Sequence, residues 1–462
     1  MNLLRKKNIQ CDVSQDIKLQ RSLSTFDLIF MGIGAIIGSG IFIVTGIVAA
    51  TKAGPGIIFS YIIAGFACGF SALSYAELAA SLGGCGSAYG YAYVGFGELI
   101  AWIVGWDLLF EYMISVSAVS VGWSAYCNSL LHAIHLDMPT NFVKGPWNGG
   151  VFDVLSVGIV AVVALLHLLG TKLSAKVNNI VVSIKLAVVL LFIVFALRDV
   201  NPQNWTPFLP FGWLGVVKGA SLIFFAYIGF DAVSTAAEEV QVPQRSLPIG
   251  ILASLLICTT LYMAVSILLT GVVPYTDLNV GSPLSHALLM HGRYFAASTI
   301  SIGAITGLTT VIIVFFYGLT RIMLAMSRDG LLPNYFAKLN KYTGTPSRII
   351  LLMGILTAGV AALLPMHELI ELVNIGTLVA FCIVCAGVIV LRYHEPNLVR
   401  PFKTPLMPLI PILGLISCFY LICNLAWYTL FRFAIWLLVG LLVYFGFSIK
   451  HSKLKNDNTN RI

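Results

Sequence analysis

The chain has 462 residues, of which 58% are hydrophobic and only 10% are charged. Since a soluble domain usually carries about 25% charged residues, these figures exclude a water-soluble globule, and they exclude a disordered chain as well. The formal net charge is +8 at pH 7, but the basic residues are scattered over many loops, so lipid headgroups rather than nucleic acid are their expected partners. The apolar segments run continuously instead of alternating, which favours an all-α polytopic membrane protein over a β-barrel.

Twelve hydrophobic segments are long enough to span a membrane as helices. In chain order they cover residues 26–50, 56–80, 97–123, 151–170, 177–197, 214–237, 248–273, 296–322, 348–364, 369–391, 406–428 and 430–449. Twelve spans place both termini on the same side of the membrane. Of the 27 Lys and Arg residues, 20 lie on that side and 6 on the other, so the positive-inside rule predicts cytoplasmic ends over residues 1–25 and 450–462.

The first span contains a glycine-rich stretch that disfavours a continuous helix. A glycine inside a helix costs about 1 kcal/mol relative to alanine, and Gly38 and Gly40 flank the hydroxyl of Ser39. We expect the helix to unwind there, and unwound backbone at membrane depth needs a polar ligand or a cavity to satisfy its N–H and C=O groups. Gly32 and Gly34 are interpreted as positions of close helix packing.

The sixth span contains a matching interruption, in which Gly229 is followed by Asp231. Spans one and six hold the same position in two successive sets of five spans, and such a pair of glycine-interrupted spans indicates the binding site of an inverted-repeat transporter. The N-terminal ends of the broken helices suit an anion, and the freed carbonyl groups suit a cation. An α-amino acid carries both charges on one carbon atom.

Three further polar positions lie near the membrane midplane when about 1.5 Å is counted per helical residue. They are Glu111 in the third span, Lys185 in the fifth, and Thr309–Thr310 in the eighth. A lysine at this depth is costly and lies too far from the surface to reach it. We therefore interpret Lys185 as a functional tether.

Carboxyl groups near the same depth are candidates for gating or coupling. Asp107 lies one turn before Glu111, so the two share a helix face and form a candidate proton site, although each also fits a protonated or hydrogen-bonded packing group. Asp231 either gates the site or ties the broken sixth span. No group of His, Cys, Asp or Glu residues has metal-binding spacing, no cofactor is expected, and Cys382-x-x-Cys385 is interpreted as packing inside an apolar helix.

Four stretches of the sequence resemble motifs of one known family. They are Gly-Ala-Ile-Ile-Gly-Ser-Gly-Ile-Phe at 34–42, Phe-Ala-Tyr-Ile-Gly-Phe-Asp at 225–231, Ala-Glu-Glu-Val followed by Pro-Gln-Arg-Ser-Leu-Pro-Ile-Gly within 237–250, and Met-Ser-Arg-Asp-Gly-Leu-Leu-Pro at 326–333. In this order they resemble the amino acid–polyamine–organocation transporters, and within them the bacterial relatives of the cationic amino acid transporters. The resemblance covers residues from about 22 to 430.

The resemblance implies a LeuT-type fold with a five-plus-five inverted repeat and two extra C-terminal helices, whereas animal cationic transporters have fourteen spans. The first repeat would cover residues 26–197, the second 214–391, and the extra pair 406–449. It also implies secondary active transport of L-amino acids by alternating access across a plasma membrane, here a bacterial inner membrane.

The resemblance also implies how a substrate is held. The substrate carboxylate would meet the backbone N–H groups of Ser39 and Gly40. The α-ammonium group would meet the carbonyl groups of Ile36, Phe225 and Ile228. Phe225 also matches the aromatic gate of the family, and a side chain at Gly40 is expected to intrude on the bound carboxylate.

The lysine of the fifth span matches a family position that replaces a sodium ion. The ammonium group of Lys185 would then hold carbonyl groups of the first span and the hydroxyl of Thr309 or Thr310. The resemblance therefore implies sodium-independent transport, either coupled to protons or working by exchange.

Bulky aromatic side chains are expected around the substrate side chain, and Glu111 is the one candidate charge near it. A buried cationic side chain would need a carboxylate partner, so a small or medium neutral amino acid is favoured. The alternatives are arginine, lysine or ornithine, an exchanger, or an amino acid sensor that no longer transports. An enzyme is not expected because no nucleophile–base set is present. The predicted substrate-binding residues are Ile36, Gly38, Ser39, Gly40, Glu111, Phe225, Tyr227 and Ile228, with Phe315 as a further lining candidate.

Overall fold

The computed structural model describes residues 5–6, 23–82, 88–133, 136, 138–170, 175–235 and 240–454. Most of the predicted cytoplasmic segments 1–25 and 450–462 therefore lies outside the described residues. Within them the chain is helical. The α-helices are α1 (Thr25–Ile36), α2 (Thr45–Val48), α3 (Ile57–Leu82), α4 (Ala88–Gly95), α5 (Glu98–Ala133), α6 (Val154–Leu168), α7 (Ala175–Ala196), α8 (Gly212–Ile223), α9 (Ala232–Thr235), α10 (Pro243–Val272), α11 (Pro283–Met290), α12 (Tyr294–Arg328), α13 (Ser347–Leu363), α14 (Met366–His394), α15 (Leu409–Cys423), α16 (Trp427–Val443) and α17 (Ile449–His451).

Shorter elements continue several of these helices. The segments η1 (Gly40–Val44), η2 (Ala49–Ala53) and η10 (Tyr444–Ser448) are π-helical. The segment η7 (Phe224–Tyr227) is a 3₁₀-helix.

Seven helical segments of the described chain are long and apolar enough to cross a membrane, and four shorter apolar helices accompany them. The first of the seven, Thr25–Leu82, contains two of the predicted spans. A helical segment thus lies at each of the twelve predicted positions. The helix α5 is longer than predicted, with 36 residues, because it continues past residue 123 into less apolar sequence. These findings confirm an all-helical polytopic membrane protein.

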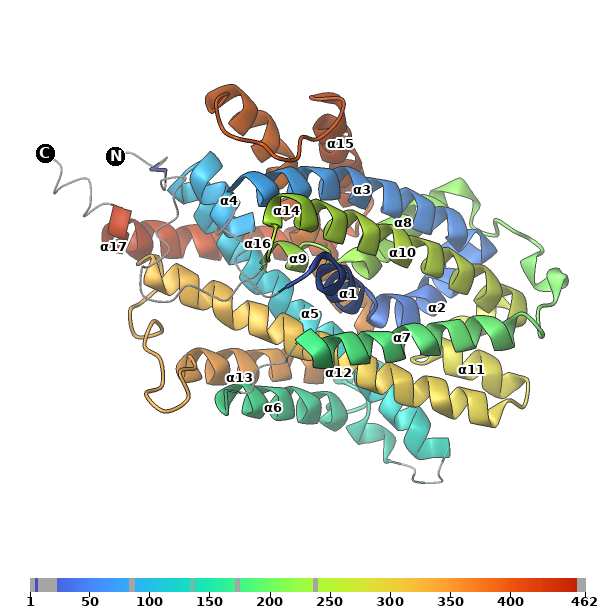
Figure 1. Ribbon diagram of the computed structural model, residues 1–462. Coiled ribbons are helices and arrows are strands. Elements are labelled where there is room, and N and C mark those ends of the chain that lie inside the picture. The colour runs from blue at the N-terminus through green and yellow to red at the C-terminus, as the bar shows by residue number, and fades with distance from the viewer. Residues whose placement is uncertain are drawn as a thin grey trace, which may run out of the picture.

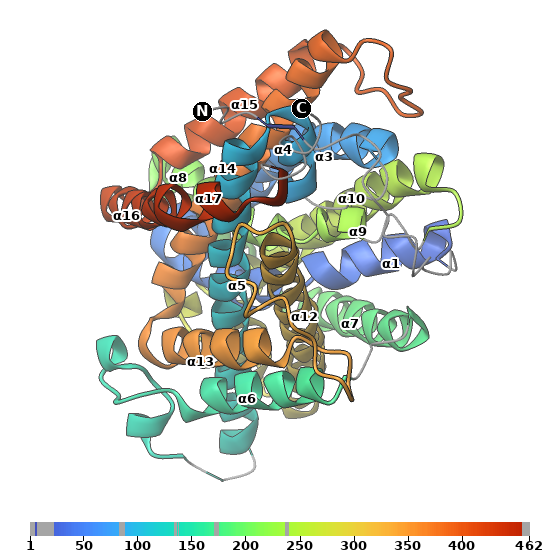
Figure 2. The same cartoon turned by 90° about the vertical axis from the view of Figure 1, so that its left-hand side faces the viewer.

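The helix α1 lies in the middle of the bundle and contacts both α10 and α7 (Figure 1). Its start is fixed by a capping box, in which the Ser24 hydroxyl accepts from the Asp27 N–H and the Asp27 carboxylate accepts from the Ser24 N–H at 3.0 Å. Leu23 pairs with Val240, so α1 and α10 begin next to each other. The long helix α5 runs through the bundle beside α12 and α14 (Figure 2).

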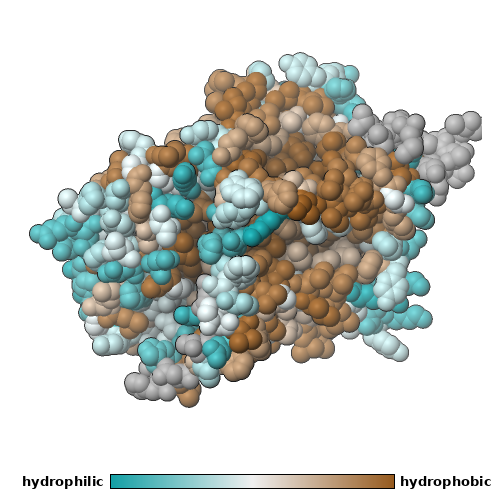
Figure 3. Space-filling view, turned by 180° about the vertical axis from the view of Figure 1, so that it is seen from behind, coloured by the Kyte–Doolittle hydropathy of each residue, from teal (hydrophilic) through white to brown (hydrophobic). Residues whose placement is uncertain are grey.

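The outer surface is strongly apolar. Figure 3 shows a broad hydrophobic area across the middle of one face, with hydrophilic side chains gathered toward its margins. Large exposed side chains such as Leu256, Ile355 and Leu442 come from helices far apart in the chain. Such a surface fits contact with lipid.

Candidate functional site

The first predicted span is interrupted near its middle. The helix α1 ends at Ile36, Ile37 is extended with φ −72° and ψ 96°, and helical structure resumes in η1 at Gly40. The interruption therefore lies at Ile37–Gly38, because Ser39 already has helical φ and ψ values. Backbone N–H groups at the start of a resumed helix lack intrahelical acceptors, so this segment offers donors to an anion.

The sixth predicted span is interrupted in the same way. The helix α8 ends at Ile223, η7 follows, and Ile228 is extended with φ −62° and ψ 135°. Gly229 has φ +121°, which a residue with a side chain rarely adopts. A Cβ there would also lie 2.8 Å from the backbone of Ala35. Gly229 thus permits both the turn and the close approach of this break to α1.

The two interruptions face each other. A Cβ added to Gly40 would lie 2.4 Å from the Cα atom of Ala226, so this glycine allows η1 to touch η7. The intrusion of a Gly40 side chain on the bound carboxylate stays a prediction, and the structure adds a clash with the backbone of Ala226. The closest constraint at Gly40 comes from the neighbouring interrupted helix.

A cavity of about 10 Å³ lies where the two breaks meet, which is room for about one water molecule. Binding of an amino acid therefore requires the surrounding helices to move apart. The cavity is lined by Ala35, Ile36, Gly38, Ser39, Gly40, Ser115, Val119, Phe225, Ile228, Val311 and Phe315.

Six of the eight predicted substrate-binding residues line this cavity, and two do not. The Tyr227 hydroxyl instead donates to the carbonyl oxygen of Tyr61 at 2.8 Å. Glu111 lies near Asp231 and Thr377, outside the cavity lining. Phe315 lines it as suggested from the sequence.

Two hydroxyl groups in the lining are buried and have no hydrogen-bond partner among the described residues. They belong to Ser39 and Ser115. Buried polar groups are nearly always paired, so both are available to a ligand. Sequence reasoning missed Ser115, although it lies four residues after Glu111 and hence on the same face of α5.

The unwound backbone is partly satisfied by side chains from neighbouring helices. The Lys185 ammonium group on α7 donates to the carbonyl oxygens of Gly34 at 2.7 Å and Ile37 at 3.2 Å. The predicted hydroxyl partners lie elsewhere, because Thr310 donates to Gly307 and Thr309 to Ile305 within α12. Among hydrogen bonds of the described residues, Lys185 therefore joins α7 to α1 without α12.

A tyrosine that the sequence did not single out connects both breaks. The Tyr262 hydroxyl on α10 lies 2.8 Å from the carbonyl oxygen of Ile36 and 2.9 Å from that of Ala226. Tyr262 is fully buried. Its single proton is shared between two carbonyl groups, one of which is the predicted ligand of the α-ammonium group.

Three carboxyl groups lead from the sixth-span interruption along α5, in the order Asp231, Glu111 and Asp107. Asp231 accepts from the Gly229 N–H at 3.2 Å and from the side chain of Tyr112, which ties the turn to α5. Glu111 lies near Asp231. Both carboxyl oxygens of Asp107 are buried without a hydrogen-bond partner in the described part of the chain.

Comparison with known proteins identifies the family. A family model described as amino acid permease matches residues 23–447. The chain belongs to the amino acid permease family. This match confirms the resemblance to the amino acid–polyamine–organocation transporters and identifies a permease rather than an enzyme.

Several relatives of the permease cover nearly the whole chain. It is 46% identical to the methylthioribose transporter of Bacillus subtilis (strain 168), over 98% of the chain and 99% of that protein. It is 48% identical to the branched-chain amino acid permease BcaP of the same strain, over the same shares. It is 30% identical to the human cationic amino acid transporter 4, over 96% of the chain and 89% of that protein.

Proposed function

We propose that the protein is a sodium-independent, proton-coupled secondary transporter of small or medium neutral L-amino acids. The observation that carries this proposal is the cavity between the two interrupted helices in a chain of the amino acid permease family. Interrupted helices that meet in this way supply donors and acceptors for a zwitterion. The cavity of about 10 Å³ must expand before it can hold a substrate, and such an expansion is a feature of alternating access.

The proposed topology has twelve membrane spans and both termini in the cytoplasm of a bacterial cell, with the protein in the plasma membrane. The inverted repeats comprise residues 26–197 and 214–391, followed by the extra pair at 406–449. The similar interruptions in the first helix of each repeat support this division.

In the proposed complex, the substrate carboxylate accepts from the N–H groups of Ser39 and Gly40. The α-ammonium group donates to the carbonyl oxygens of Ile36, Phe225 and Ile228, and Phe225 closes over the substrate. Binding at Ile36 displaces the shared hydrogen bond of the Tyr262 hydroxyl. Substrate binding would therefore weaken the hydrogen bonds by which Tyr262 joins the two interrupted helices.

The proposed ion coupling rests on a fixed cation and a carboxyl cluster. The Lys185 ammonium group donates hydrogen bonds to carbonyl oxygens at the first interruption, and in the proposal it takes the place of a sodium ion there. Asp107, Glu111 and Asp231 are the proposed proton carriers because Asp231 lies at the second interruption, Glu111 lies near Asp231, and Asp107 lies near Glu111. Exchange without net proton movement is the alternative.

A neutral substrate is supported by the lining of the cavity. Val119, Val311 and Phe315 are apolar, and no carboxylate of the described residues is part of the lining. A cationic side chain would lack a counter-ion there. Transport of arginine, lysine or ornithine is therefore the weaker alternative, and a sensor that binds without transport is a more remote one.

Methylthioribose is a second candidate substrate. The relative at 46% identity is named as its transporter, and the unpaired hydroxyl groups of Ser39 and Ser115 can hydrogen-bond to a sugar. The carboxylate and ammonium sites would then be unused.

Competition in liposomes tests these assignments. The purified protein is reconstituted, and the uptake of labelled L-valine is measured with excess unlabelled alanine, serine, leucine, arginine, lysine or methylthioribose. Saturable uptake displaced by neutral amino acids is expected. Stronger competition by arginine would indicate a cationic amino acid transporter, and stronger competition by methylthioribose would indicate a methylthioribose transporter. Binding without uptake would indicate a sensor.

A further inference from the structure

A second cavity lies on the outside of the bundle, at the end where α1 and α10 begin. It measures about 620 Å³ and lies between the start of α10 and the loop that follows α14. It is lined by Gln244, Arg245, Pro248, Ile249, Leu252, Ala253, Leu256, Pro401 and Phe402. Nothing in the proposed transport mechanism uses these residues.

An exposed basic residue, Arg245, lies at one end of this groove. The ion pairs formed among the described residues do not include its guanidinium group. Arg245 lies in the first turn of α10, where Pro243 has no N–H group and no side chain caps the helix. The guanidinium group and the start of the helix therefore both favour an anion.

Apolar side chains continue from this charge along one face of α10. Ile249, Leu252 and Leu256 follow Arg245 at intervals of four, three and four residues, which keeps them on the same helix face. The eleven steps from Arg245 to Leu256 span about 16 Å. This length is about half of the hydrocarbon thickness of a bilayer, or one leaflet.

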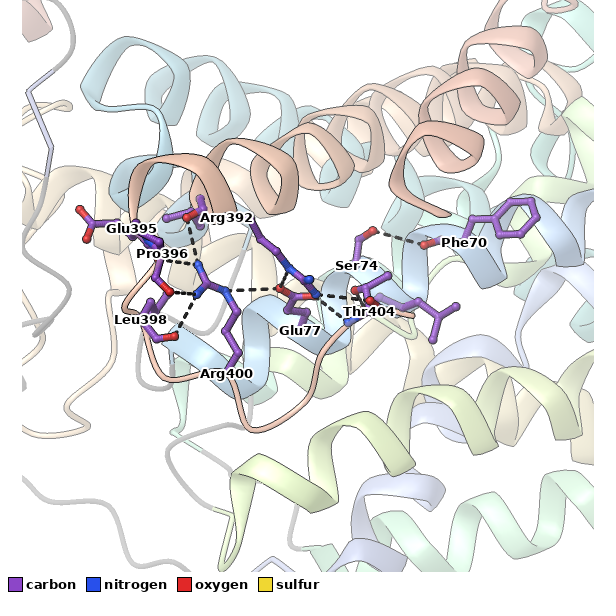
Figure 4. A network of polar contacts seen from close by, with 11 residues as sticks. Phe70, Ser74, Glu77, Arg392, Glu395, Pro396, Leu398, Arg400 and Thr404 are labelled. Carbon is purple, nitrogen blue, oxygen red and sulfur yellow. Dashed lines mark hydrogen bonds and ion pairs between the residues drawn. The ribbon is translucent and has the colours of Figure 1, made fainter. Parts of the chain in front are cut away.

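The opposite wall of the groove is held in place by buried polar contacts. Glu77 on α3 accepts from Arg392 at 2.8 and 2.7 Å and from the N–H of Thr404 at 2.7 Å, and Arg400 lies 3.6 Å from it (Figure 4). Phe402 lies between two of these anchored residues in the sequence. The loop that carries Phe402 into the groove is therefore anchored on both sides of this residue.

We propose that this groove binds one anionic glycerophospholipid from the adjacent leaflet. The phosphate group pairs with Arg245 at the start of α10, and an acyl chain lies along Ile249, Leu252 and Leu256 against Phe402. The lipid then connects the anchored loop to α10. Since Tyr262 on α10 holds both interrupted helices, the bound lipid stabilises the helix that supports the substrate site.

Native mass spectrometry of the purified full chain tests the proposal with phosphatidylglycerol and phosphatidylcholine as probes. The variants are Arg245→Gln and, as a matched control, Arg328→Gln, which removes another exposed arginine at the end of α12. The wild type and the control are expected to retain one phosphatidylglycerol. The Arg245→Gln variant is expected to bind it about tenfold more weakly, as for the loss of one charge-assisted hydrogen bond.

Three results would overturn the lipid site. The first is unchanged phosphatidylglycerol binding by Arg245→Gln. The second is an equal loss in both variants, which would indicate diffuse attraction by surface charge. The third is equal retention of phosphatidylcholine, which would show that the groove takes any acyl chain. Thermal unfolding of each variant checks that the fold is intact, and a groove-filling variant, Ala253→Phe, replaces Arg245→Gln if that variant does not fold.

Discussion

Gly40 and Gly38 lie two residues apart in the first interruption but face different surroundings. A Cβ at Gly40 would clash with the backbone of Ala226, whereas one at Gly38 would lie 3.5 Å from Val311, an ordinary contact. We expect Gly40→Ala to lose substrate binding and about 1–3 kcal/mol of stability through overpacking. Gly38→Ala should keep its thermal stability. Equal melting temperatures for the two purified variants would contradict the close approach of η1 to η7.

The buried Tyr262 hydroxyl lies within hydrogen-bonding distance of a carbonyl oxygen in each of the two interrupted helices. Tyr262→Phe leaves the carbonyl groups of Ile36 and Ala226 without this partner, which is expected to cost about 1–3 kcal/mol and to change substrate affinity. Tyr126→Phe is the control, because the Tyr126 hydroxyl donates to Phe42 at 2.7 Å, outside the cavity lining. Binding and melting curves should show both effects for Tyr262→Phe and only the stability effect for Tyr126→Phe. Unchanged affinity in Tyr262→Phe would remove Tyr262 from the site.

At the scale of helices, the buried carboxylate of Glu77 joins α3 to the end of α14 and the loop beyond it. Glu77→Ala leaves Arg392 and Arg400 without their common counter-ion, and loss of a buried ion pair typically costs about 3–5 kcal/mol. Glu368 pairs with Arg432, which is 45% exposed, so Glu368→Ala should cost at most about 1 kcal/mol. Thermal unfolding in the same detergent compares the two variants. A similar small loss in both would mean that the Glu77 network does not anchor the loop.

The helical segments at the twelve predicted spans could be predicted because each span is a continuous apolar run of sufficient length, whereas the short helices α4 and α11 lie between those spans and were not predicted. The interruptions could be predicted because glycine is the residue that a helix tolerates least after proline. The partners of the interruptions could not be predicted in the same way. Tyr262 and Ser115 are ordinary residues in their own helices, and their importance arises only when α10 and α5 pack against the breaks. The side of α12 that Thr309 and Thr310 face depends on the same packing.

Across the whole molecule, the proposed function predicts which ion drives transport. The Lys185 side-chain nitrogen donates to the carbonyl oxygen of Gly34, where the proposal has it replace a sodium ion, so uptake should be the same when sodium is replaced by potassium and should increase when the outside is acidified. Lys185→Ala should be inactive or uncoupled, because the carbonyl groups of Gly34 and Ile37 lose their partner. Uptake into liposomes with imposed ion gradients measures both effects. A steep dependence on sodium in the intact protein would contradict this reading.

In the proposed function, the two interrupted helices together hold the amino acid. An electron cryomicroscopy structure of the full chain with a bound neutral amino acid tests it most directly. We expect density between η1 and η7, with the carboxylate within hydrogen-bonding distance of the N–H groups of Ser39 and Gly40 and the ammonium group at the carbonyl oxygen of Ile36. Substrate density at another place in the protein, with η1 and η7 still in contact with each other, would contradict binding between the two interrupted helices.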